Sequence, residues 1–126
     1  MILYHYTSSL HMPSIQYEGM IRTTESNIGS PIPSMPPYGD HYGPDVVWLT
    51  NRPDVSTTAV NAMGPKGDVC ITVNVSGLYI HHWPKWAREQ GINEDWYDVL
   101  ANGFDPESWY ISTRPIPITE WMSIDE

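Results

Sequence analysis

Proline is the residue type that most restricts how this chain can fold. Twelve of the 126 residues are proline. Proline fixes φ, lacks a backbone N–H and favours an extended conformation in the residue before it. We therefore predict short elements joined by extended connections rather than long helices. Pro115 and Pro117 also exclude their segment from a central position in a sheet.

The chain length predicts a single domain over residues 1–126, since a chain of this size fits one core. The strands and helices expected below make this domain α+β. Alternation and β-branched residues predict five strands. These strands span residues 2–7, 46–50, 69–75, 109–113 and 121–124.

Capping and breaking residues predict four short helices. Ser8 and Ser9 are candidate N-caps for the first helix, which we expect to end at Glu18 before Gly19. Pro13 is tolerated only near its first turn. The other helices are expected over residues 56–63, 85–90 and 93–101.

Composition excludes some classes of function. The chain is 40% hydrophobic, so it is not disordered by composition, and its formal net charge is −9. Such a charge repels phosphate backbones, so we do not expect bulk nucleic acid to bind. Arg22, Arg52 and Arg114 lie at expected element ends, where they either form a local basic pocket or remain solvated.

Cysteine and histidine do not indicate a metal site. Cys70 is the single cysteine, which excludes an internal disulfide and a thiolate zinc cluster, and we expect it to be a buried apolar residue. His81 and His82 are adjacent and cannot easily chelate together, so we interpret them as a solvated turn. No leader or membrane-spanning segment is recognised. We expect a cytoplasmic protein, in the host cytoplasm if a phage encodes it.

The segment from Thr23 to Pro44 is rich in Ser, Pro, Gly and Tyr. Connections of this length are usually functional or disordered. Because it carries Tyr38, His41 and Tyr42, we interpret it as a functional loop.

The N-terminal segment resembles a known superfamily. Leu3-Tyr4-His5-Tyr6-Thr7, a short helix containing Ile15, and Glu18-Gly19-Met20-Ile21 follow in that order. They resemble the opening of the diphtheria-toxin-like and RNA 2′-phosphotransferase-like branches of the ADP-ribosyltransferase superfamily. The resemblance implies a split, mostly antiparallel β-sandwich with short peripheral helices and an NAD cleft between its sheets.

The resemblance also implies a set of NAD-binding residues. His5 would bond the adenosine-side ribose hydroxyls, and Thr7 would support the nicotinamide amide or its ribose. Alternate residues of a strand project to one side about 7 Å apart, so two groups can hold two parts of one ligand. The complete set implied for NAD is His5, Tyr6, Thr7, Tyr38, Tyr42, Trp48, Thr50, Ser56 and Thr57, with Trp48 or a loop tyrosine stacking on nicotinamide.

The third expected component is a carboxylate before a late strand. Glu107 is the first candidate and Glu120 the second. Cleavage of the nicotinamide–ribose bond builds positive charge on the sugar, which a carboxylate stabilises. Each assignment has a structural alternative: His5 and Trp48 as core residues, and Glu107 as a turn or surface residue.

Three functions are open on the sequence. The first is an NAD-dependent mono-ADP-ribosyltransferase that modifies a protein or a small molecule. The second is a catalytically inactive acidic inhibitor module, of the viral or mobile-element type, that blocks a basic partner surface. The third is hydrolysis of NAD or ADP-ribose at the same site, with water as the acceptor.

Overall fold

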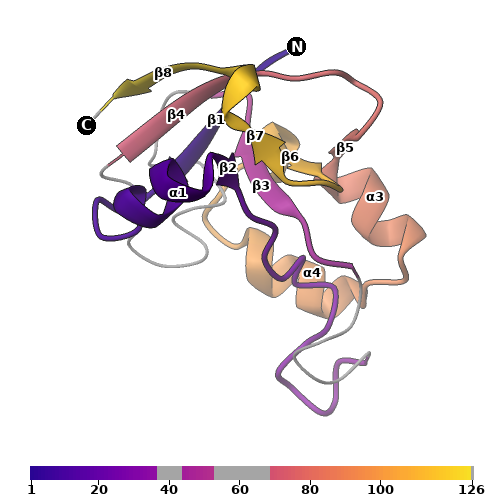
Figure 1. Ribbon diagram of the computed structural model, residues 1–126. Helices are drawn as coiled ribbons and strands as arrows, with labels where there is room; N and C mark the ends of the chain where they lie inside the picture. Colours follow the sequence, from indigo (N-terminus) through magenta and orange to yellow (C-terminus); the bar gives the residue numbers. More distant parts are fainter. Residues whose placement is uncertain (37–43, 53–68, 126) are drawn as a thin grey trace.

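The computed structural model (Figure 1) describes residues 1–36, 44–52 and 69–125 of the chain. Within these residues the fold is α+β, as predicted, with an antiparallel sheet at its centre. The strands are β1 (Ile2–Thr7), β2 (Met20–Ile21), β3 (Val47–Thr50), β4 (Val69–Asn74), β5 (Ile80–His82), β6 (Trp109–Ser112), β7 (Ile116–Pro117) and β8 (Trp121–Asp125). The helices are α1 (Met12–Glu18), α3 (Trp83–Glu89) and α4 (Glu94–Ala101), with 3₁₀ turns η2 (Pro106–Ser108) and η3 (Ile118–Glu120).

Six strands form one sheet in the order β5-β6-β3-β1-β4-β8. β1 pairs with β4 along its whole length, from Ile2–Asn74 to Thr7–Val69. With β3, in contrast, β1 has a registered pair only at Tyr4–Thr50. The two central strands therefore part beyond this pair. A separate two-stranded sheet joins β2 and β7, which keeps Pro117 away from the central ladder, as expected.

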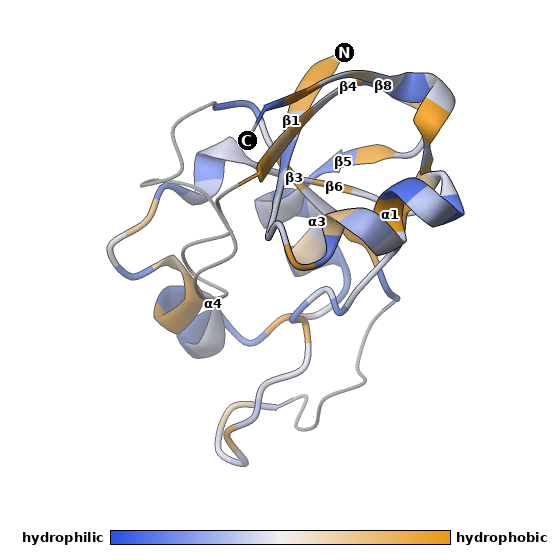
Figure 2. Cartoon of the chain, turned by 60° about the vertical axis from the view of Figure 1, so that its left-hand side comes forward, coloured by the Kyte–Doolittle hydropathy of each residue, from blue (hydrophilic) through white to orange (hydrophobic). Residues whose placement is uncertain are grey.

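Each face of the six-stranded sheet carries its own apolar core, because successive strand residues point to opposite sides. On one face Leu3, Val47 and Ile71 pack with Met12 of α1 and with β2 and β7. On the other face Trp109 and Ile111 pack against α3 and α4. Figure 2 shows hydrophobic residues at the start of β1, which lies in the middle of the sheet.

The five expected strands are confirmed to within one residue at each end. The first helix is shorter than predicted, because residues 9–11 form a turn and α1 begins at Met12. Ser8 and Ser9 are therefore not its caps, and the Ser8 hydroxyl is buried without a partner among the described residues. Gly19 ends α1 in the left-handed conformation with φ of 69°, as expected.

The helices after β5 also differ slightly from expectation. His81 and His82 are strand residues of β5 rather than a turn, and β5 leads directly into α3 at Trp83. α3 begins two residues early because Pro84 fits the first helical turn, where no N–H is needed. α4 is confirmed, with the Asn93 side chain accepting hydrogen bonds from the N–H groups of Asp95 and Trp96. No helix in the described part of the chain is long and apolar enough to cross a membrane.

Candidate functional site

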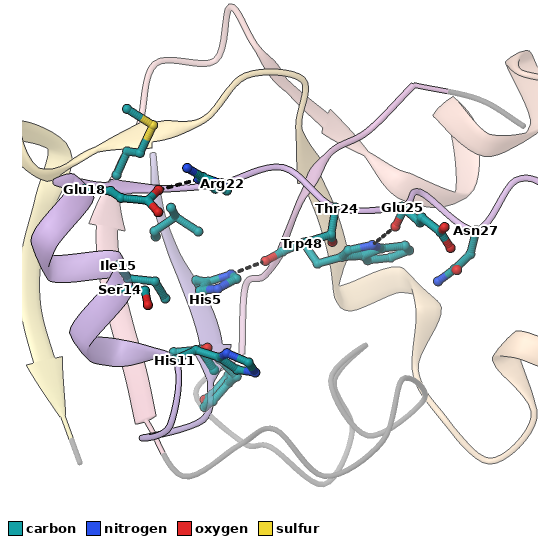
Figure 3. A pocket seen from close by; sticks show the side chains of 14 residues that line it. His5, His11, Ser14, Ile15, Glu18, Arg22, Thr24, Glu25, Asn27 and Trp48 are labelled. Carbon is teal, nitrogen blue, oxygen red and sulfur yellow. Dashed lines mark hydrogen bonds and ion pairs between the residues drawn. The ribbon is translucent and has the colours of Figure 1, made fainter. Parts of the chain in front are cut away.

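A pocket of about 750 Å³ lies where β1 parts from β3 (Figure 3). This volume falls within the range of small-molecule sites, about 300–1,000 Å³. The lining residues come from four neighbouring segments of the chain. They are His5, Tyr6 and Thr7 of β1; His11, Ser14, Ile15 and Glu18 of α1 and the turn before it; Met20, Ile21, Arg22, Thr24, Glu25 and Asn27; and Trp48 of β3.

His5 lies at the point where the ladder between β1 and β3 ends. Its Nδ1 is 2.9 Å from the carbonyl oxygen of Trp48, so the imidazole bridges the parted strands. A carbonyl oxygen only accepts hydrogen bonds, and Nδ1 must therefore carry the proton. In the neutral ring Nε2 is then an acceptor, which suits a ligand hydroxyl.

The expected grouping of His5, Tyr6, Thr7 and Trp48 around one pocket is found. Thr7 lies two residues beyond His5 in β1 and is buried. The Tyr6 hydroxyl makes a long hydrogen bond of 3.5 Å to the carbonyl oxygen of Arg52. Arg52 in turn pairs with Asp105, at 3.1 Å.

Trp48 is both a pocket residue and a core residue. Its ring lies 5.3 Å from that of Trp83 and 6.0 Å from that of Trp109. Its indole N–H donates to the carbonyl oxygen of Glu25 at 2.9 Å, as Figure 3 shows. The two interpretations of Trp48 from the sequence are therefore compatible.

The pocket contains one arginine and two carboxylates. The Arg22 guanidinium bonds the Glu18 carboxylate, and its side chain remains 72% exposed. Glu25 belongs to the opposite wall. Of the three arginines at element ends, Arg22 is the one that lines this pocket, and an exposed guanidinium can bind phosphate or carboxylate groups.

The two candidate carboxylates lie outside the pocket lining. Glu107 is in η2, with its side chain 75% exposed and 3.7 Å from Nε2 of His82. The carbonyl oxygen of Glu107 accepts from the same Nε2, at 2.9 Å. Glu120 forms an ion pair with Arg114 at 2.6 Å.

The remaining predicted residues divide into two groups. Thr50 is buried, and its hydroxyl accepts from the N–H of Arg52 instead of facing the pocket. Tyr38, Tyr42, Ser56 and Thr57, together with the helix expected over residues 56–63, lie outside the described residues. Among the residues that the structure describes, no cluster of His, Cys, Asp or Glu could hold a metal ion.

Sequence reasoning missed most of the far wall of the pocket. Thr24, Glu25 and Asn27 were covered only by the general expectation that residues 23–44 form a functional loop. His11 and Glu18 were missed as pocket residues.

Comparison with known protein families, curated proteins and solved structures finds no match to this chain. The basis for assigning a function is therefore the pocket itself.

Proposed function

We propose that the pocket binds NAD and that the protein transfers ADP-ribose from NAD to a protein or small-molecule acceptor. The single observation that carries the proposal is the position of His5. It lies on a central strand, at the parting of β1 and β3, and lines a pocket large enough for a nucleotide. The parted strands and the additional β2–β7 sheet also support a split sandwich of the ADP-ribosyltransferase type.

Binding follows from the chemistry of the walls. In the proposal the Nε2 side of His5 contacts a ribose hydroxyl, because Nδ1 donates to Trp48. Arg22 suits the diphosphate, and Thr7 offers a hydroxyl on the same side of β1. In the proposal, Tyr38, Tyr42, Ser56 and Thr57 keep the ligand-contacting roles that the resemblance implies.

The reaction breaks the bond between nicotinamide and ribose and forms a bond between ribose and the acceptor nucleophile. Nicotinamide leaves, and the acceptor loses a proton. A carboxylate stabilises the positive charge that develops on the ribose. We assign this role to Glu107, with the nicotinamide end of NAD running from His5 past Tyr6 toward Arg52. The contacts from Tyr6 to Arg52 and from Arg52 to Asp105 connect the pocket to the segment just before Glu107.

One observation favours the second function, an inactive binding module. The side chain of Glu107 is exposed and lies outside the pocket lining. A protein that binds NAD without consuming it, or that holds a basic partner through its net charge of −9, would belong to this class.

The decisive variant is His5→Asn. The asparagine side-chain nitrogen can replace Nδ1 as the donor to Trp48, whereas nothing replaces Nε2. We expect His5→Asn to retain the melting temperature and lose NAD binding. Glu107→Gln is expected to bind NAD normally and to lose transfer, measured with labelled NAD in a cell lysate. Release of labelled ADP-ribose without a modified acceptor would indicate hydrolysis instead. Normal NAD affinity in a folded His5→Asn protein would contradict the assigned role.

A further inference from the structure

Three tryptophans hold three consecutive carbonyl groups of the pocket wall. The indole N–H of Trp48 donates to Glu25 at 2.9 Å, that of Trp83 to Ser26 at 3.2 Å, and that of Trp96 to Asn27 at 2.9 Å. The donors come from β3, α3 and α4. We call residues Glu25, Ser26 and Asn27 the clamped wall. Its outer residues, Glu25 and Asn27, line the pocket.

The clamped wall needs these donors because it belongs to no strand. Thr24, just before it, exchanges two backbone hydrogen bonds with Val46, at 2.7 and 2.6 Å. Ile28, just after it, is 1% exposed in the core beneath α3 and α4. The bond to Ser26 is buried, the bond to Asn27 is part-buried and the bond to Glu25 is exposed. A buried carbonyl without a donor is costly, so the irregular segment needs a side-chain partner at Ser26 above all. Indole supplies a donor and no acceptor, which matches a row of carbonyl oxygens.

The clamped wall also contains an unusual backbone conformation. Asn27 has φ of 60°, a left-handed conformation that is uncommon for residues other than glycine. Such conformations persist where the surrounding structure enforces them. The bond from Trp96 to the Asn27 carbonyl fixes this residue directly, although Trp96 itself is not part of the pocket lining.

We propose that Trp48, Trp83 and Trp96 are positioning residues that hold the clamped wall in the conformation that binds ligand. The identity of the ligand, NAD, rests on the proposed function. The aromatic core under α3 and α4 thus sets the shape of a pocket that is lined by β1, α1 and the segment after α1. Trp96 acts on ligand affinity through Asn27, without touching the ligand.

The test compares Trp96→Phe with Trp86→Phe. Both tryptophans lie in the same core, at 9% and 6% exposure, so both variants lose a similar ring. Only Trp96→Phe removes a donor to the clamped wall. We expect Trp96→Phe to raise the Kd for NAD about fivefold or more above that of Trp86→Phe, which corresponds to about one hydrogen bond. Equal Kd values in the two folded variants would overturn the proposal.

A second measurement does not depend on NAD. Amide hydrogen exchange across residues 25–28, without ligand, should be faster in Trp96→Phe and unchanged in Trp86→Phe. If wild-type protein fails to bind NAD, the proposed function is wrong, and this exchange result still decides whether the clamp exists. Unchanged exchange in Trp96→Phe would refute the clamp.

If Trp96→Phe does not fold, Asn27→Gly and Asn27→Ala test whether the wall depends on the positive φ of Asn27. Both remove the carboxamide, but only glycine adopts a positive φ without strain. Exchange protection across residues 25–28 should persist in Asn27→Gly and fall in Asn27→Ala. Equal protection in the two variants would contradict an enforced wall conformation.

Discussion

Trp83→Phe should destabilise the protein more than Trp109→Phe, although both residues are completely buried. Each is 0% exposed, and each variant removes the same ring atoms from the same core. The costs of the resulting cavities are therefore similar and largely cancel in the comparison. What differs is the hydrogen bonding of the two indole N–H groups.

The Trp83 N–H satisfies the buried carbonyl of Ser26, whereas the Trp109 N–H is buried without a partner among the described residues. Trp83→Phe leaves that carbonyl unsatisfied, at about 1–3 kcal/mol, and Trp109→Phe removes an unsatisfied donor of similar cost. We expect Trp83→Phe to be less stable than Trp109→Phe by about 2–6 kcal/mol.

Urea unfolding followed by far-ultraviolet circular dichroism measures this difference without depending on the tryptophan signal. The two variants expose nearly the same surface on unfolding, so their m-values should agree and the midpoints alone should differ. If Trp109→Phe is as unstable as Trp83→Phe, the indole bonds contribute nothing beyond packing, and the account of the clamped wall is wrong.

Two further predictions concern the framework around the pocket. Gly19→Ala should cost about 1–2 kcal/mol, because φ is 69° and the added Cβ meets no atom closer than 3.9 Å, so the cost is backbone strain. Gly77→Ala, which has open space and no positive φ, should be near neutral in the same urea unfolding assay. Burial raises the pKa of the Cys70 thiol, so a disulfide reagent at pH 7.5 should react more slowly with folded than with unfolded protein. Equal reaction rates for folded and unfolded protein would contradict this burial of the thiol. The raised pKa also means that the folded protein holds the thiol proton more tightly, so the contribution of Cys70 to the free energy of unfolding is complete below the pKa of the unfolded state. That contribution is lost as the pH rises through the pKa of the folded state.

Local patterns were sufficient to predict most of the elements. The strand Val69–Asn74 is β-branched and buried at alternate positions, and the end of α1 at Gly19 follows from a left-handed conformation that favours glycine. The serines misplaced the start of α1, although Pro13, which fits only the first helical turn, was the local signal for a start at Met12. Local patterns also placed His81 and His82 in a turn, because an edge strand of three residues has too few positions to show alternation.

The site was predictable only where it follows one strand. His5, Tyr6 and Thr7 are close in sequence, and their placement beside the pocket follows from β1. Glu25 and Asn27 reach the pocket because tryptophans from 23 to 69 residues away bind their carbonyls. No local pattern records such long-range contacts. For the same reason the sequence could not indicate that Glu107 would lie against His82, outside the pocket lining.

Calorimetric titration of NAD into wild-type and His5→Asn protein tests whether the pocket binds NAD through His5. We expect saturable binding at one site per chain in the wild type, and its loss in a His5→Asn protein that melts at the wild-type temperature. Absence of binding to the wild type at millimolar NAD, or equal binding to both proteins, would contradict this role of His5.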